Sequence, residues 1–161
     1  MALSAIGHYK EAIAEIEGKI AAQPKNPLGL SFRGRIEAFA GNYANAARWF
    51  ERAREADPVS SQSAVSLAQV YDRLGRVDDA ISLLENGPPQ WRNAPAVRFW
   101  LGLSYALAGR KEQAAAEFGA FRALAPKWTL SSTQRYWSRY FTPQFSDRIA
   151  ALSREYGIPE K

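Results

Sequence analysis

The sequence predicts an all-α fold, an α-solenoid of stacked helix–turn–helix units. The first observation is a recurrence at intervals of 34 residues, with glycines at Gly7, Gly41, Gly75 and Gly109 and alanines at Ala12, Ala46, Ala80 and Ala114. The second is that apolar residues between these markers recur every three or four positions, which is typical of one face of an α-helix. The third is that prolines keep the same interval, at Pro24 and Pro58. Such a period is typical of helical repeats, whose units bury their apolar faces against one another.

The composition indicates a single globular domain. The 161 residues are enough for one continuous core, and no apolar run is long enough to cross a membrane. The chain has no cysteine, which excludes disulfides and thiolate chemistry and fits a reducing compartment. The formal net charge of +5 is that of an ordinary solvated surface. We therefore predict a cytoplasmic protein without a membrane span.

Residues 1–26 predict only the second helix of a repeat, from Tyr9 to Ala22, with Gly7 as the turn glycine. Ile13, Ile16 and Ile20 share one face of this helix, and no preceding sequence is present to form its partner. A repeat buries its apolar face against its neighbours, so this face lacks one of them. We expect either a fragment of a longer protein, in which Met1 is not the native start, or a face covered by another molecule. A homodimer through these isoleucines is one form of the second alternative.

Three complete repeats follow, at residues 27–60, 61–94 and 95–128. Pro27 suits the start of a helix, and Gly41 suits the turn to the next one. The second repeat is less regular, because its second helix, predicted at Val77–Glu85, ends early at a Gly-Pro-Pro segment. We expect Trp91 to fill the space that this short helix leaves. The alternative is that Trp91 is an exposed aromatic residue that binds a partner.

Residues 129–161 predict two capping helices that differ in sequence from the repeats, as terminal units commonly do. The first is expected to begin at Ser131 or Ser132 and to run to about Phe141, where Thr142-Pro143 breaks it. The second is expected to begin at Ser146 or Asp147. Their aromatic side chains are expected to close the core.

The segment Leu101-Gly-Leu-Ser-Tyr, followed by Ala114, Phe118 and Pro126, resembles the tetratricopeptide repeat, and the likeness extends over about residues 7–128. The resemblance implies a right-handed superhelix whose concave face is lined by the first helix of each pair. It also implies a scaffold without catalysis of its own that binds a peptide or a partner protein. The tail after Phe141 is similar to the ends of bacterial repeat regions attached to adenylate cyclase or regulator domains. This second likeness implies a module of a larger bacterial regulatory or signalling protein.

The positions that line the groove in this family carry over to one set of residues in this sequence. They are Arg35, Phe39, Gln69, Asp72, Arg73, Phe99, Leu103 and Trp137. We predict that these residues form the partner-binding groove, polar at its N-terminal end and apolar at its C-terminal end. The chaperone-binding members of the family clamp a terminal carboxylate with lysines and asparagines. Those residue types are absent from the matching positions here, so a terminal carboxylate is not the expected ligand.

No pattern in the sequence predicts an enzyme, a cofactor or a metal site. His8 is the single histidine, no acidic cluster has metal-ligand spacing, and no phosphate-binding loop is present. The alternative function is nucleic-acid binding by a basic solenoid, since eight basic residues and two acidic ones lie between Asn86 and Arg139. Helical-repeat RNA readers place base-reading side chains in every repeat, and this chain shows no such recurrence. The sequence therefore favours protein binding over nucleic-acid binding.

Overall fold

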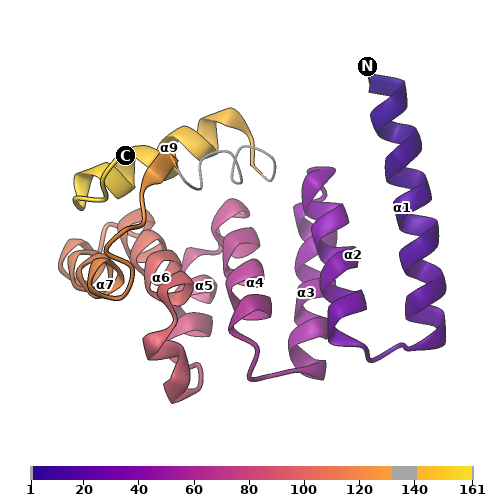
Figure 1. The fold of residues 1–161 in the computed structure, drawn as a ribbon, viewed down its shortest axis with the longest axis horizontal. Coiled ribbons are helices and arrows are strands. Elements are labelled where there is room, and N and C mark those ends of the chain that lie inside the picture. Colours follow the sequence, from indigo (N-terminus) through magenta and orange to yellow (C-terminus); the bar gives the residue numbers. More distant parts are fainter. Residues whose placement is uncertain (1, 132–140, 161) are drawn as a thin grey trace.

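The computed structural model describes the backbone of residues 2–131 and 141–160, and the side chains of residues 11–131 and 141–160. Within these ranges the regular structure is entirely helical. The elements are α1 (Ala2–Ala22), α2 (Pro27–Phe39), α3 (Tyr43–Ala56), α4 (Ser61–Arg73), α5 (Val77–Glu85), the 3-10 helix η1 (Pro89–Asn93), α6 (Pro95–Leu107), α7 (Lys111–Leu124) and α9 (Pro143–Glu155). The helices stand in a row in chain order from α1 to α7, and α9 lies across one end of that row (Figure 1). The predicted α-solenoid is confirmed.

The turn within each complete repeat is made by a glycine in the left-handed conformation. The φ angles of Gly41, Gly75 and Gly109 are 80°, 76° and 74°, so the three turns are equivalent. The residue after each glycine donates its backbone N–H to a carbonyl five positions earlier, as Arg76 does to Tyr71 at 2.8 Å. This hydrogen bond satisfies a carbonyl group that the end of the helix would otherwise leave unpaired. The turn requires a positive φ angle, which glycine adopts without strain.

Gly7 differs from this pattern and corrects the prediction for the first unit. It lies inside α1, a continuous helix of 21 residues from Ala2 to Ala22, and does not form a turn. The residues before Gly7 extend the same helix. A glycine inside a helix costs about 1 kcal/mol relative to alanine, which a helix of this length can absorb.

Small residues allow the two helices of a repeat to pack closely. A Cβ atom at Gly34 of α2 would lie 2.8 Å from the ring of Phe50 in α3. The equivalent atom at Gly102 of α6 would lie 3.1 Å from the ring of Phe118 in α7. Phe50 and Phe118 are almost fully buried as a result. The spacing of small and aromatic positions in the sequence therefore reflects direct contact within each hairpin.

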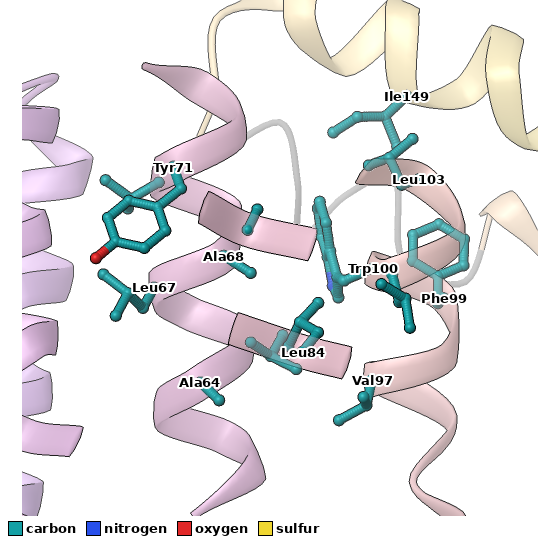
Figure 2. Packing of buried hydrophobic residues seen from close by; sticks show 14 of the residues in the cluster. Ala64, Leu67, Ala68, Tyr71, Leu84, Val97, Phe99, Trp100, Leu103 and Ile149 are labelled. Carbon is teal, nitrogen blue, oxygen red and sulfur yellow. The ribbon is translucent and has the colours of Figure 1, made fainter. Parts of the chain in front are cut away.

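One continuous core runs through the repeats and into the C-terminal cap. Figure 2 shows its central part, where Leu67 and Tyr71 of α4 and Leu84 of α5 belong to the same buried cluster as residues of α6. Further on, Phe99 packs edge-on against Phe118, with ring centroids 5.6 Å apart. Edge-to-face aromatic pairs of this kind add to the free energy gained from burial alone.

The C-terminal cap follows the prediction in outline. Its second helix, α9, begins at Pro143 rather than at Ser146 or Asp147, because Thr142 is extended and the proline occupies the first helical position. The chain after α9 returns to the start of the cap, where the Leu130 N–H donates to the Pro159 carbonyl at 2.9 Å. The predicted first helix of the cap lies largely outside the described residues.

Trp91 fills the space beside the short helix α5, as predicted. Its side chain is 2% exposed, and its Nε1–H donates to the carbonyl oxygen of Val59 at 2.8 Å. A partner could not contact this ring on the surface, so the alternative of an exposed binding residue is wrong.

Candidate protein-interaction surface

The accessible part of the predicted groove lies on α2 and α4. Arg35 of α2 and Gln69 of α4 occupy equivalent positions of their repeats, and both are half-buried. Phe39 and Arg73 form the next equivalent pair; Phe39 is 49% exposed and Arg73 is half-buried. Four of the eight predicted groove residues therefore have surface that a ligand could contact.

Arg73 also connects the repeats to the C-terminal cap. Its Nη2 donates to the Thr142 hydroxyl at 3.2 Å, at the start of α9. Its guanidinium lies 5.0 Å from the ring centroid of Tyr43 and 5.2 Å from that of Phe145. A cation between two aromatic faces is held by their quadrupoles, so Arg73 fixes α9 against α3 and α4.

Three other predicted groove residues are buried. Asp72 is 5% exposed, Phe99 3% and Leu103 0%. Figure 2 shows Leu103 of α6 beside Ile149 of α9, and the Phe99 ring lies 5.1 Å from that of Trp128. Leu103 is thus covered by the C-terminal cap, whereas Phe99 is enclosed by α7 and Trp128 of its own repeat, and a ligand on the surface would not reach these side chains. The eighth residue, Trp137, lies outside the described residues.

Asp72 has an unusual environment for a carboxyl group. Its Oδ2 accepts a hydrogen bond from the Ser104 hydroxyl at 2.8 Å, while its Oδ1 has no hydrogen-bond partner in the described part of the chain. Burial raises the pKa of Asp72 to about 8, and the hydrogen bond from Ser104 opposes part of that rise. The carboxyl group is therefore mostly protonated at neutral pH and is a structural group between α4 and α6.

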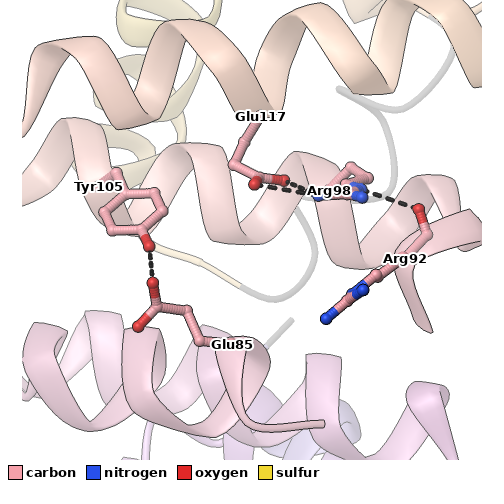
Figure 3. Close-up of polar contacts among 5 residues, drawn as sticks. All are labelled: Glu85, Arg92, Arg98, Tyr105 and Glu117. Carbon is pink, nitrogen blue, oxygen red and sulfur yellow. Dashed lines mark hydrogen bonds and ion pairs between the residues drawn. The ribbon is translucent and has the colours of Figure 1, made fainter. Parts of the chain in front are cut away.

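A tyrosine–glutamate pair recurs between successive repeats. The Tyr71 hydroxyl of α4 donates to Glu51 of α3 at 2.8 Å, and the Tyr105 hydroxyl of α6 donates to Glu85 of α5 (Figure 3). Both tyrosines stand 20 residues after their partners. Burial, and next the hydrogen bond to the neighbouring carboxylate, raise the pKa of each tyrosine to about 12. These pairs link the second helix of one repeat to the first helix of the next.

The first junction uses an arginine in place of the tyrosine. At the position equivalent to Tyr71, α2 has the buried residue Glu37, whose Oε1 lies 2.5 Å from Nη1 of Arg33. Nη2 of Arg33 also lies 3.6 Å from Glu17 of α1. A buried charge requires such pairing, so Arg33 connects α1 to α2.

Several of the basic residues that suggested nucleic-acid binding are engaged within the chain. Arg98 Nη1 lies 2.7 Å from Glu117, and its Nε donates to the Arg92 carbonyl at 2.8 Å (Figure 3). Arg110 lies 2.6 Å from Asp78. These ion pairs reduce the positive charge that this half of the solenoid presents to phosphate groups.

Two exposed apolar residues of α2 were not among the residues predicted to bind a partner. Leu28 is 70% exposed and Phe32 is 49% exposed. The Arg35 guanidinium lies 4.1 Å from the Phe32 ring centroid and partly covers it. A signal was present, because the residues 34 positions later are the polar Gln62 and Ser66. A comparison of equivalent positions between repeats would have shown that α2 is more apolar at these two positions than α4.

Two kinds of feature are absent from the described residues. No group of three His, Cys, Asp or Glu side chains among them lies close enough together to hold a metal ion. Among the described helices, none has the length and apolar character needed to cross a membrane.

Comparisons with known proteins agree with this architecture. Three tetratricopeptide repeat models match residues 1–61, 40–99 and 96–127. Superkiller complex protein 3 of Mus musculus is 29% identical over 76 residues, an alignment that covers 47% of this chain and only 5% of that protein.

The solved structures share the fold at low sequence identity. MamA from Desulfovibrio magneticus RS-1 superposes with a TM-score of 0.67 at 16% identity, covering 94% of this chain and 85% of that one. YrrB, a TPR protein with an unusual peptide-binding site, superposes with a TM-score of 0.64 at 16% identity, covering 97% of this chain and 81% of that one.

Proposed function

Because the chain belongs to the tetratricopeptide repeat family, we propose that it is a non-catalytic scaffold that binds a peptide or protein segment on the exposed inner surface of α2 and α4. The observation that carries this proposal is the apolar surface of α2. Leu28, Phe32 and Phe39 are each at least 49% exposed. An exposed cluster of large apolar side chains is typical of an interaction site.

The chemistry of this surface specifies the kind of ligand. Phe39 and Leu28 offer apolar contact, while Arg35 of α2 and Arg73 of α4 are half-buried and carry positive charge. A segment with apolar side chains next to an aspartate or glutamate would satisfy both features. The peptide-binding site named for YrrB supports the choice of a peptide, since the two chains share one fold.

The wider context follows from the sequence. We place the chain as a module of a larger bacterial regulatory or signalling protein that acts in the cytoplasm, on the likeness of its tail to such repeat regions. Nucleic acid has less support as a partner, because Arg98 and Arg110 are held in ion pairs with Glu117 and Asp78.

The test begins with affinity purification on the full chain, followed by truncation of the recovered partner to a minimal peptide. Calorimetry then compares the chain with the double variant Arg35→Glu, Phe39→Ala, which we expect to bind at least about tenfold more weakly. The matched control is Arg48→Glu, Leu124→Ala, at exposed positions of the outer helices α3 and α7. Equal affinity of both double variants would refute the proposed surface. Binding only to nucleic acid, with steep salt dependence, would favour the alternative function.

A further inference from the structure

The helix α9 lies across the row of helices, with its start near α4 and its end near α7 (Figure 1). At its start, Thr142 accepts a hydrogen bond from Arg73 of α4 at 3.2 Å, and the Phe145 ring centroid lies 5.2 Å from the Arg73 guanidinium carbon. Further along α9, Ile149 lies beside Leu103 of α6 (Figure 2). Arg73 and Leu103 are two of the positions predicted to bind a partner, so α9 occupies part of the predicted groove.

The spacing of these contact residues is that of a helical ligand. Thr142, Phe145 and Ile149 follow one another at intervals of three and four residues, so they share one face of α9. Asp147 and Arg148, between them in the sequence, are exposed to solvent. Amphipathic helices whose anchors have this spacing are a recurring kind of ligand for protein grooves. α9 therefore contacts α4 and α6 in the manner of a bound peptide helix.

The two ends of α9 are attached to different parts of the chain. At its C-terminal end, the ring of Tyr156 stacks on that of Phe118 in α7, the preceding described helix, with centroids 5.1 Å apart. At its start, the hydrogen bond from Arg73 to Thr142 joins residues that are 69 positions apart in the sequence. The start of α9 can therefore separate from α4 while its end stays attached to α7.

Polar atoms are less well satisfied at the start of α9 than in its second half. Arg73 Nε and Ser146 Oγ are buried and have no hydrogen-bond partner among the residues that the structure describes. In the second half of α9, the buried Ser153 hydroxyl donates to the Ile149 carbonyl at 2.8 Å. A buried polar atom without a partner opposes the contact that buries it, because water would satisfy it on exposure. The start of α9 is thus the half that a competing helix could displace more easily.

We propose that the inner surface of α4 and α6 is a helix-binding site that α9 fills in the unbound protein, and that an amphipathic helix of a different protein displaces the first half of α9 from it. The contacts of α9 specify the pattern of this helix. It has a hydrogen-bond acceptor beside Arg73, an aromatic residue three positions later, and an aliphatic residue four positions after that. The site adjoins the proposed surface of α2 and α4 at Arg73, but it does not depend on a ligand there.

The probe is a fluorescent peptide with the sequence of residues 141–156, which includes all three contact residues of α9. In the full chain, Ile149→Asp places a charge beside Leu103 and should release the chain's own α9 from the site. We expect this variant to bind the probe at least about tenfold more tightly than the unmodified chain in fluorescence anisotropy, because the tethered helix of the unmodified chain competes. The matched control is Arg148→Asp, at an exposed position of α9, which should bind the probe as weakly as the unmodified chain.

Two further substitutions locate the bound probe. Arg73→Ala, added to the Ile149→Asp chain, should weaken binding at least about fivefold, because the probe loses the partner of its threonine and its first aromatic ring. Arg35→Glu, added in its place, should leave binding unchanged, so a failure of the surface proposed on α2 would not affect this result. No binding by a folded Ile149→Asp chain, or equal binding by the Ile149→Asp and Arg148→Asp chains, would overturn the proposal.

Hydrogen exchange tests the same proposal without requiring a variant to fold. The unmodified full chain, labelled with ¹⁵N, is mixed with an excess of unlabelled peptide, so that mass spectrometry distinguishes the fragments of the two. Amides in the first half of the chain's own α9 should exchange at least about threefold faster with the peptide than without it. Equal rates would contradict displacement. A dimer in light scattering that Ile149→Asp converts to a monomer would overturn the assignment to a different protein and identify the displacing helix as α9 of a second copy.

Discussion

At the residue scale, Asp72 is the group whose chemistry depends most on burial. Its pKa rises from an ordinary value of 3.8 to about 8, because the charged carboxylate loses its hydration. At a pH between these two pKa values, the carboxyl group of Asp72 keeps its proton in the folded protein but has released it in the unfolded chain. The resulting stabilisation is fully present below pH 3.8 and is lost as the pH rises through about 8.

We predict that Asp72→Asn makes the protein more stable at alkaline pH. An amide cannot ionise and can still accept the hydrogen bond from Ser104, so the variant avoids the buried charge. The gain should be about 1 to 5 kcal/mol at pH 9 and close to zero near pH 4. Urea unfolding at both pH values checks this, with Asp147→Asn on the exposed face of α9 as the control. Parallel pH profiles of the Asp72→Asn variant and the unmodified chain would show that the buried carboxyl does not titrate as described.

At the element scale, the three turn glycines perform one task that other residues perform poorly. Gly75 has a φ of 76°, and no side chain lies within 4 Å of the position that a Cβ atom would take. The cost of a larger residue there is therefore backbone strain and not a clash. Gly119, inside α7, likewise has open space around it but lies in ordinary helical backbone.

We predict opposite effects for alanine at these two glycines. Gly75→Ala should lower the free energy of unfolding by about 1 to 2 kcal/mol, because L-residues are strained at positive φ. Gly119→Ala should raise it by up to about 1 kcal/mol, because alanine has the higher helix propensity. Chemical denaturation of both variants gives the comparison. A Gly75→Ala variant as stable as the parent chain would mean that the turn can adopt another conformation.

At the scale of the whole molecule, the solenoid is supported unequally at its two ends. The C-terminal end is closed by the cap, in which Tyr156 stacks on Phe118 with ring centroids 5.1 Å apart. At the other end, α1 packs on α2 along one side, and a groove beside it is open. In a repeat protein each unit is stabilised by its neighbours, so a helix with fewer neighbours opens more readily.

We predict that amides of α1 exchange with solvent at least about tenfold faster than those of α4 and α6. Hydrogen exchange followed by mass spectrometry measures this on the full chain. Uniform protection from α1 to α6 would indicate that the first helix is as stably packed as the central repeats.

The repeat architecture was set by features that act locally. The interval of 34 residues, the glycine turns and the end of α5 at Glu85 depend on backbone conformation and on neighbours within one hairpin, so they could be predicted from the sequence. Trp91 was also predictable, because the short helix left a space of aromatic size nearby.

The extent of the binding surface was decided by contacts between distant parts of the chain. Helical spacing correctly places Phe99 and Leu103 on one face, but it cannot say that α7 and Trp128 enclose Phe99 or that α9 lies against Leu103. In the same way, Gly7 has the spacing of a turn glycine, yet α1 continues through it. The sequence by itself determined which residues share a face. Only the tertiary structure decided which faces are covered, because coverage depends on elements far away along the chain.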